Sequence, residues 1–304
     1  MKRLYEIIRP TTVIEATRLS HRLGLDLTIV SETFQHTGSF KFRAAYNVAQ
    51  SVPHKMIITA SSGNFGQAMA YACQMLGKTC VVVMPDTSAQ VKIAAVREYG
   101  GMVDLIDTRT TSRSGRVRDL GSANSEAYLA SAYDDPLVIA GNATLGEEIA
   151  HLRRPIDLVL APMGGGGLTS GIITGLRRAG NPIAVLAAEP LTANDAARSL
   201  RAGRIVANES EPQTLADGAR TVSVGEHNWA IIREGLAEII EVTEEQIREA
   251  VRLLFSLANL KTEPTGALAL AALLAAGQRF RGRSICCVVS GGNVDPALFR
   301  ELLA

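Results

Sequence analysis

The stretch Ile156-Asp157-Leu158-Val159-Leu160-Ala161-Pro162-Met163-Gly164-Gly165-Gly166-Gly167-Leu168 decides the fold of this chain. An apolar run typical of a strand leads into four consecutive glycines, and a helix-like stretch continues to residue 178. Four glycines remove every side chain that would keep an anion away from the backbone amides, and a helix that begins there adds unpaired N–H groups. The stretch therefore predicts a phosphate cradle. A merely tight turn is the alternative, but it needs only one or two glycines.

Outward from this stretch, short apolar runs alternate with amphipathic ones, which is typical of a parallel sheet covered by helices on both faces. We expect strands at 56–60, 79–84, 102–106, 156–160, 183–188 and 285–289, and helices at 65–76, 89–99, 168–178, 243–259 and 264–276. The polar stretch 109–126 is predicted to be a mobile surface segment. The fold class is therefore α/β with a mostly parallel sheet, and 304 residues suffice for two domains.

The composition argues against several classes of partner. Thirty-one basic and thirty acidic residues leave a net charge of +1 without a basic stripe, so a nucleic-acid partner is not expected. The most apolar stretch, 267–276, is about half the length that spans a bilayer, and we expect a cytoplasmic protein without a membrane partner. The scattered histidines show no metal-ligand spacing. The cysteines lie in apolar runs and are predicted to be buried reduced thiols: Cys73, Cys80, Cys286 and Cys287.

Lys41 lies in a second informative segment, residues 37–45. If a helix begins here, Lys41 shares its apolar face with Ala44 and Val48, whereas Arg43 falls on the other side. A buried lysine has a lowered pKa because desolvation disfavours the ammonium, and the neutral amine is the form that attacks an aldehyde to give a Schiff base. The alternative is a snorkelling lysine whose charged end reaches water.

Six short motifs occur in order: Ser39-Phe40-Lys41-Phe42-Arg43, Ser61-Ser62-Gly63-Asn64, Gly164-Gly165-Gly166-Gly167-Leu168, Thr214-Leu215-Ala216-Asp217-Gly218, Glu263-Pro264-Thr265 and Ser290-Gly291-Gly292-Asn293. With them the chain resembles, along nearly its whole length, the fold type II pyridoxal-phosphate (PLP) enzymes of the threonine/serine dehydratase and serine racemase group. The resemblance implies a tryptophan-synthase-β-like fold of two doubly wound parallel-sheet domains with the active site in the cleft. Residues 1–46 and 134–304 would form a large PLP-binding domain, and residues 47–133 a small mobile domain.

The resemblance also implies which residues hold the cofactor. Lys41 would carry the PLP aldehyde as a Schiff base, Asn64 would contact the phenolic oxygen and Ser290 the pyridine nitrogen. A hydroxyl need not protonate that nitrogen, which favours loss of a β-leaving group. A loop serine in a glycine-rich turn is the alternative for Ser290. The full cofactor-binding set is Phe40, Lys41, Asn64, Gly164, Gly165, Gly166, Gly167, Leu168, Glu263 and Ser290.

The substrate is implied to lie beside the second motif, where a helix start can bind its carboxylate. A turn with serine as helix N-cap is the alternative there. Arg113 would reach the carboxylate when the small domain closes, unless it is a solvated arginine. Phe65 departs from the group, in which histidine or threonine is usual, and this weakens the inference that threonine or serine is the substrate. The implied substrate-binding set is Ser61, Ser62, Gly63, Asn64, Phe65, Arg113 and Asp217, with Lys41 and Ser62 as catalytic residues.

A metal site is implied by the segment from Glu189 to Asp195. Related enzymes bind a cation there through the two carboxylates and an intervening carbonyl, so Glu189, Asp195 and the Ala193 backbone are the candidate ligands. Oxygen ligands favour Mg²⁺ or Ca²⁺. The alternative makes Asp195 a helix cap and Glu189 a strand-end carboxylate.

The implied function is that of a PLP-dependent ammonia-lyase, a dehydratase that converts an L-β-hydroxy amino acid such as threonine or serine to a 2-oxo acid and ammonia. Lys41 would remove the α proton as general base. A serine-racemase-like enzyme is the first alternative, with Ser62 delivering a proton to the opposite face. A β-replacement synthase and a non-catalytic PLP-binding protein are further alternatives. Relatives suggest a homodimer.

Overall fold

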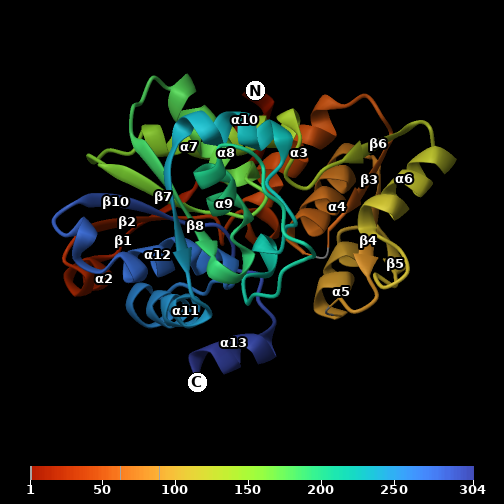
Figure 1. The fold of residues 1–304 in the computed structure, drawn as a ribbon. Coiled ribbons are helices and arrows are strands. Elements are labelled where there is room, and N and C mark those ends of the chain that lie inside the picture. The colour runs from red at the N-terminus through yellow and green to blue at the C-terminus, as the bar shows by residue number, and fades with distance from the viewer. Residues whose placement is uncertain (1, 62, 89) are drawn as a thin grey trace.

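The computed structural model describes residues 2–61, 63–88 and 90–304. Their strands form two separate sheets, one of six strands and one of four. Figure 1 shows the two sheets side by side, the larger on the left and the smaller on the right, with helices packed around both. The predicted α/β class with parallel sheets is confirmed.

The six-stranded sheet has the order β1-β2-β10-β7-β8-β9. Neighbouring strands are parallel except for the antiparallel pair of β1 and β2. The central strands β7 and β10 are buried almost throughout, as a parallel sheet with helices on both faces requires. The strand bounds are β1 Thr12–Glu15, β2 Asp26–Ser31, β7 Leu158–Pro162, β8 Ala184–Pro190, β9 Leu236–Val242 and β10 Ser284–Val289.

The four-stranded sheet has the order β5-β4-β3-β6, and all its pairs are parallel. The helices α4, α5 and α6 connect its strands in chain order. The bounds are β3 Met56–Ala60, α4 Asn64–Leu76, β4 Thr79–Pro85, α5 Gln90–Glu98, β5 Met102–Ile106, α6 Arg113–Ala123 and β6 Ala127–Ala130. This sheet lies within the predicted small domain, whose bounds stay a prediction.

The remaining helices cover the larger sheet, and α3 joins it to the helices of the smaller one. Helix α3 lies between α4 and α7, and α7 packs on α8. A Cβ on Gly175 would lie only 2.1 Å from the Ala143 carbonyl oxygen, so glycine is needed for α7 and α8 to approach this closely. The bounds are α1 Lys2–Ile7, α2 Thr17–Leu23, α3 Lys41–Ser51, α7 Pro136–Ala150, α8 Gly167–Arg178, α9 Asp195–Ala202, α10 Glu226–Gly235, α11 Glu244–Ala258, α12 Leu268–Ala276 and α13 Pro296–Leu303.

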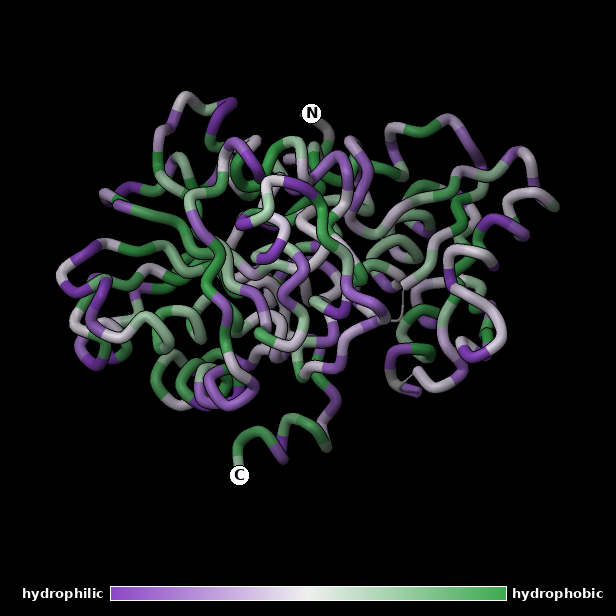
Figure 2. The backbone as a smooth tube through the Cα atoms, viewed as in Figure 1, coloured by the Kyte–Doolittle hydropathy of each residue, from purple (hydrophilic) through white to green (hydrophobic). Residues whose placement is uncertain are grey.

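The hydrophobic core divides between the two faces of the larger sheet and one face of the smaller sheet. Leu158 and Leu160 of β7 pack with α11 and α12, whereas Val159 and Ala161 pack with α7 and α8 on the opposite face. This is the two-residue period of a strand buried on both sides. A third cluster joins α3 and α4 to the smaller sheet. Figure 2 shows hydrophobic residues along these strands and hydrophobic and hydrophilic residues alternating along the helices.

The six expected strands are confirmed, with ends within two residues of those predicted. The five expected helices are confirmed as α4, α5, α8, α11 and α12. The sequence did not reveal the strands β1, β2, β6 and β9 or the helices α1, α2, α7, α9, α10 and α13. The polar stretch 109–126 contains the helix α6, because Ser112 accepts a hydrogen bond from the Gly115 amide as N-cap and starts the helix. Its surface position is confirmed by the absence of buried residues in α6, and its mobility stays a prediction.

All four cysteines are buried and free, which confirms the prediction made for them. Burial raises the pKa of the Cys287 thiol to about 12, so this group is held in its unreactive protonated form. Over the ranges that the structure describes, none of the helices combines the length and the apolar character needed to cross a membrane.

Candidate active site

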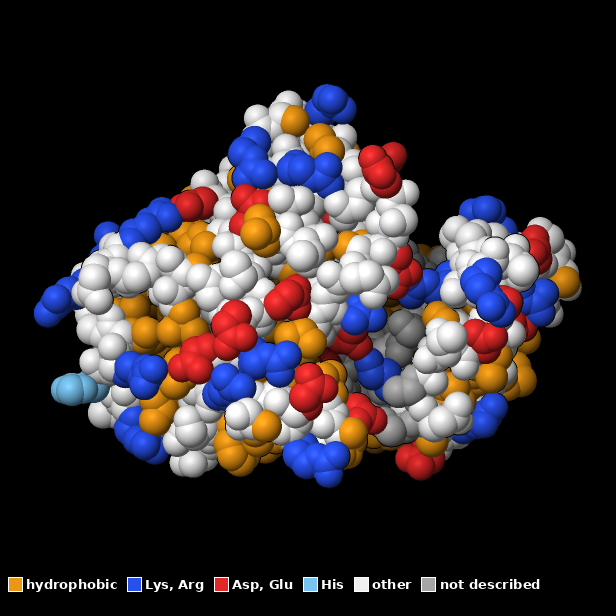
Figure 3. All heavy atoms as spheres, turned by 60° about the horizontal axis from the view of Figure 1, so that its bottom comes forward, with side chains coloured by type: hydrophobic (Ala, Val, Ile, Leu, Met, Phe, Trp, Pro, Cys, Tyr) orange, Lys and Arg blue, Asp and Glu red, His pale blue; other side chains and the backbone are white. Residues whose placement is uncertain are grey.

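A cavity of about 760 Å³ lies between the two sheets. It is lined by residues at the carboxyl ends of β3, β6, β7 and β10, which is where ligands bind in doubly wound α/β proteins. Figure 3 shows the molecule hollowed between its larger and smaller parts, with basic and acidic side chains along the rim. All six sequence motifs contribute residues to the cavity lining. The predicted site residues found in the lining are Phe40, Lys41, Ser61, Gly63, Asn64, Phe65, Arg113, Gly164, Gly165, Gly166, Gly167, Leu168, Asp217, Glu263 and Ser290.

The four-glycine loop joins β7 to α8 and has the features of an anion site. Gly166 has a φ of +97°, and α8 begins at Gly167 without a cap from any described side chain. A Cβ on Gly165 would lie 2.3 Å from the Tyr133 ring. The Asn228 Nδ2 donates to the Gly165 carbonyl oxygen at 2.8 Å and so holds the loop. The free amides and the positive end of the α8 dipole form a place for a phosphate.

Lys41 is the first residue of α3, and its side chain lines the cavity. Its Nζ donates to the Ala132 carbonyl oxygen at 2.8 Å and lies 5.0 Å from the centroid of the Phe40 ring. Burial lowers the pKa of Lys41 to about 8, opposed in part by the Glu263 carboxylate. The side chain thus points into the cavity, and the amine loses its proton more readily than an exposed lysine does.

Helix α3 is buried more completely than its sequence pattern indicates. Residues 42–49 are all buried, because α3 lies between α4 and α7. Arg43, which the pattern placed opposite the apolar face, is 0% exposed. A charged side chain is tolerated there because two carboxylates, from Glu32 and Glu148, pair with it.

Asn64 begins α4 and is held by a directional chain of hydrogen bonds. The Asn293 Nδ2 donates to the Thr37 carbonyl oxygen at 2.7 Å and to Asn64 Oδ1 at 2.8 Å. The Asn64 Nδ2 then donates to Glu263 Oε1 at 2.7 Å. Burial, together with the Asp217 charge, raises the pKa of Glu263 to about 8. Because a backbone carbonyl can only accept, this chain fixes which side of the Asn64 amide donates.

The serines of two motifs lie at strand ends. Ser290 directly follows β10, is 1% exposed and lines the cavity, while its carbonyl oxygen accepts from the Phe40 amide at 3.0 Å. Ser61 follows β3, and its hydroxyl accepts from the Gly63 amide at 3.3 Å. The N-cap of α4 is Gly63 rather than a serine, so the alternative of a serine-capped helix is wrong. Ser62, predicted to be catalytic, lies outside the described residues.

Two ion pairs cross the cavity from the smaller to the larger part of the molecule. Arg113, the first residue of α6, pairs with Glu211, and Lys92 of α5 pairs with Asp217. All four side chains line the cavity. Arg113 is partly exposed and held in an ion pair, and its contact with a substrate carboxylate stays a prediction. Lys92 and Glu211 were not predicted from the sequence, because neither lies in a glycine- or serine-rich motif.

Comparison with known proteins shows which family of enzymes the chain belongs to. A family model described as "Pyridoxal-phosphate dependent enzyme" matches residues 4–291. The chain belongs to this family. It is 35% identical to an L-threo-3-hydroxyaspartate ammonia-lyase from Pseudomonas sp, over 99% of this chain and 95% of that protein. It is 34% identical to the serine racemase of Mus musculus, over 96% of this chain and 88% of the racemase.

Solved structures agree with this assignment. A threonine deaminase from T.th. superposes with a TM-score of 0.90 at 40% identity, over 97% of this chain and 96% of that one. The fold type II class predicted from the motifs is thus confirmed. The chain is a PLP-dependent enzyme of the group that contains hydroxy-amino-acid ammonia-lyases and serine racemases.

The residues of the cavity fit the cofactor of this PLP-dependent family. The glycine loop leaves a space that a Cβ at Gly165 would fill, next to a helix start suited to the phosphate. Lys41 supplies an amine of lowered pKa for the aldehyde. Ser290 and Asn64 line the same cavity and carry the hydroxyl and the amide that the resemblance assigns to the ring.

The predicted metal ligands lie together at the end of β8, outside the cavity lining. Glu189 Oε1 and Oε2 accept from the Ala196 and Ala197 amides at 3.2 and 2.9 Å, so it is Glu189 that caps α9. Asp195 Oδ1 accepts from the Asn208 Nδ2 at 3.1 Å. Asp195 Oδ2 is buried and has no hydrogen-bond partner among the described residues. The described ranges hold no cluster of three or more histidine, cysteine, aspartate or glutamate side chains suited to a metal.

Proposed function

We propose that the protein is an ammonia-lyase that removes water and ammonia from an L-β-hydroxy amino acid and releases a 2-oxo acid. The single observation that supports this most directly is the meeting of Lys41 and the four-glycine loop in one cavity. Bound PLP supplies an electron sink for charge developing at the substrate Cα. The protein's own residues must then hold the phosphate, orient the substrate and move one proton.

Each of these tasks falls to a described residue. The glycine loop and the start of α8 would hold the phosphate, and Ser290 would face the ring nitrogen. Asn64 would donate to the phenolic oxygen from its Nδ2, the atom that the Asn293 contact turns toward Glu263. Lys41, with its pKa lowered to about 8, removes the α proton as general base. The start of α4, with Ser61, Gly63 and Asn64, takes the substrate carboxylate.

A substrate with a second carboxylate suits this cavity best. Besides Lys41, the lining contains four cationic side chains, those of Lys92, Arg113, Arg118 and Arg220. The relative named for L-threo-3-hydroxyaspartate acts on such a compound. We place the second carboxylate on the Arg113 guanidinium, where it replaces Glu211. Phe65 offers an aromatic wall instead of the polar side chain usual in this group, which accords with a substrate other than threonine.

We expect L-threo-3-hydroxyaspartate to be turned over with a higher kcat/KM than L-serine or L-threonine. Arg113→Gln should lower that kcat/KM about 10-fold, because a hydrogen bond to a charged group contributes about 1.5 kcal/mol or more. The kcat/KM for L-serine, which has no second carboxylate, should fall by a smaller factor in the same variant. The measurement is release of 2-oxo acid and ammonia, with chiral chromatography of the remaining amino acid.

Arg109→Gln is the matched control, because Arg109 also forms an ion pair, with Asp107, but is exposed and outside the cavity lining. Arg109→Gln should leave the kcat/KM for all three substrates unchanged. Equal losses for hydroxyaspartate and serine in Arg113→Gln would contradict the assignment of Arg113. Formation of D-amino acid faster than 2-oxo acid would favour the racemase instead.

We also propose that Glu189, Asp195 and the Ala193 carbonyl bind Mg²⁺ or Ca²⁺. The orphaned Asp195 Oδ2 supports this, since a buried carboxylate oxygen without a partner is costly and a hard cation satisfies it. The site lies beside the start of α9 and does not line the cavity, so its role is structural.

Saturating Mg²⁺ or Ca²⁺ should raise the melting temperature of the protein by roughly 5 °C, as expected for a ligand at about 100 times its Kd. Asp195→Asn should abolish the shift because it removes one ligand charge, whereas Asp107→Asn, at a partly exposed carboxylate that pairs with Arg109, should retain it. Differential scanning calorimetry with and without each cation is the measurement. The absence of any shift in the wild type with both ions would overturn the proposed site.

Assembly into a homodimer, a cytoplasmic location and the domain bounds 1–46 with 134–304 and 47–133 stay predictions from the sequence. Catalysis by Ser62 likewise stays a prediction, since Ser62 lies outside the described residues. The two ion pairs that cross the cavity support the small domain as a unit that closes on the large one.

A further inference from the structure

Arg43 lies two residues after Lys41, at the start of the same helix. Two residues correspond to a rotation of about 200°, so the two side chains leave α3 on opposite sides. Lys41 lines the cavity, whereas Arg43 is 0% exposed and points away from it into the larger part of the molecule. Arg43 is therefore placed to hold α3 on the side of the helix opposite the cavity.

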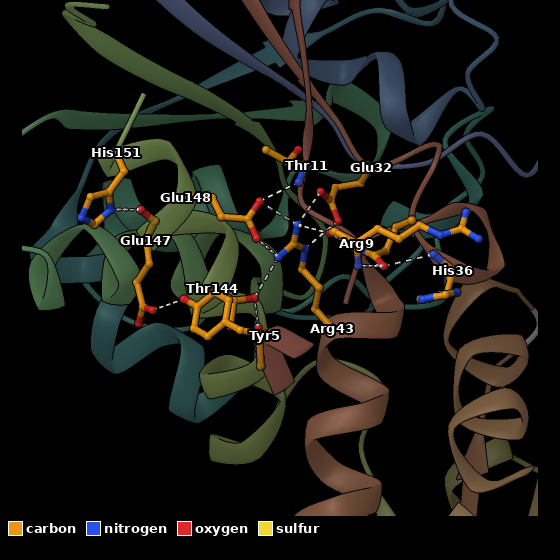
Figure 4. A network of polar contacts seen from close by, with 12 residues as sticks. Tyr5, Arg9, Thr11, Glu32, His36, Arg43, Thr144, Glu147, Glu148 and His151 are labelled. Atoms are coloured by element: carbon orange, nitrogen blue, oxygen red, sulfur yellow. Dashed lines mark hydrogen bonds and ion pairs between the residues drawn. The ribbon is translucent and has the colours of Figure 1, made fainter. Parts of the chain in front are cut away.

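The Arg43 guanidinium binds two acidic side chains and one hydroxyl at once (Figure 4). Its Nε and Nη2 donate to the two carboxylate oxygens of Glu32 at 2.7 and 2.9 Å. Its Nη1 donates to Thr144 Oγ1 at 3.0 Å and to Glu148 Oε1 at 2.7 Å. The Nη2 also reaches Glu148 Oε2 at 3.2 Å and the Arg9 carbonyl oxygen at 3.4 Å. Every N–H group of the planar fork can thus be engaged.

These partners belong to the larger sheet and to α7, not to α3 itself. Glu32 directly follows β2 in the larger sheet, and Thr144 and Glu148 lie about one turn apart on α7. Glu148 is itself fixed by the Thr11 amide, which donates to Oε2 at 2.6 Å. A Cβ on Gly141 of α7 would lie 2.5 Å from the Arg43 carbonyl oxygen, so the two helix backbones are in close contact. The fork therefore ties the first turn of α3 to the larger sheet and to α7.

The first turn of α3 is held by the Arg43 fork and, just before the helix, by the Phe40 amide, which donates to the Ser290 carbonyl oxygen. Phe40 occupies the N-cap position and no described side chain caps the helix. Stability alone is a poor reason for the anchor, since replacing a buried ion pair by well-packed apolar side chains is often neutral or stabilising. A planar fork with two fixed carboxylates is, by contrast, a good way to fix the direction and rotation of a helix.

We propose that Arg43 is a positioning residue that fixes the first turn of α3 and thereby the direction in which the Lys41 amine enters the cavity. This inference rests on the proposed role of Lys41 as the residue that binds PLP. It assigns to Arg43 no contact with cofactor or substrate. Misplacing a reacting group by about 1 Å can cost as much as 100-fold in rate.

The test measures the reaction of apoprotein with PLP, without substrate. The rate constant of capture is followed by absorbance, and borohydride reduction with peptide mapping gives the fraction of label on Lys41. Arg43→Lys keeps the charge but loses the fork, so capture should slow about 10-fold, and Arg43→Met should slow it further. Thr144→Val, which removes one partner and leaves Arg43 in place, should slow capture by a smaller factor.

Leu254→Ala is the control for lost stability, because Leu254 is buried in α11 on the far face of the larger sheet. It should lower the melting temperature yet leave capture by the folded protein unchanged. Wild-type capture rates in Arg43→Lys and Thr144→Val would overturn the proposal and reduce Arg43 to a structural role. Normal labelling of Lys41 with no turnover of any hydroxy amino acid would instead refute the proposed lyase and leave the role of Arg43 standing.

Discussion

Lys41→Ala is expected to lower turnover by about 10⁴-fold, because it removes both the amine that binds the cofactor and the general base. The Lys41 Nζ has no substitute among the described residues of the cavity lining, since the other lysine there, Lys92, is held in an ion pair with Asp217. Weak PLP binding should persist through the glycine loop and the start of α8. Assay of 2-oxo acid release, together with titration of PLP absorbance, separates these two effects.

Lys78→Ala is a close control for this result. Lys78 also has a pKa lowered by burial and also donates to a backbone carbonyl, that of Val52, at 2.6 Å, but it lies outside the cavity lining. Turnover should be unchanged in Lys78→Ala. Capture of PLP by the wild-type apoprotein should accelerate as pH rises and level off above about 8, because only the neutral Lys41 amine attacks. Label on any other lysine would refute the assignment.

The elements foreseen from the sequence are those with a clear local pattern. β3, β4, β5, β7, β8 and β10 are short apolar runs between turn residues, and their neighbouring helices end at glycines or begin after them. Helix α7 lacked such a signal because it packs against both α3 and α8 and is apolar nearly all round. The edge strand β1 is only four residues long and has alternate residues exposed, which leaves too little pattern to read.

The sequence predicted those site residues that lie in recognisable motifs, but not the residues that pair with them. The glycine loop, Lys41, Asn64 and Ser290 are marked by unusual local sequence, and the fold brings them to one cavity. The side chains that form ion pairs around the site are marked by no local sequence pattern. Glu148 meets Arg43 across 105 positions of the chain, and Lys92 meets Asp217 across 125. Such pairs are decided by which helix lies beside which strand, so only the tertiary structure reveals them.

Gly165→Ala is expected to weaken PLP binding by about 100-fold, the equivalent of about 3 kcal/mol of overpacking. The added Cβ would lie 2.3 Å from the Tyr133 ring, so either the ring or the loop must move. Gly165 has no positive φ, unlike Gly166, and the effect is therefore one of space rather than backbone strain. Equilibrium titration of apoprotein with PLP measures the loss, and calorimetry verifies that the variant is folded.

The double variant Gly165→Ala, Tyr133→Ala distinguishes this cause from a general disturbance of the loop. Removing the ring frees the space that the new methyl group needs, so the double variant should bind PLP more tightly than Gly165→Ala alone. Tyr133→Ala by itself should weaken binding only mildly, because Asn228 still holds the Gly165 carbonyl at 2.8 Å. A favourable coupling between the two substitutions is the expected signature of residues in direct contact. Strict additivity would mean that the ring does not shape the phosphate cradle, and that the glycine is required for another reason.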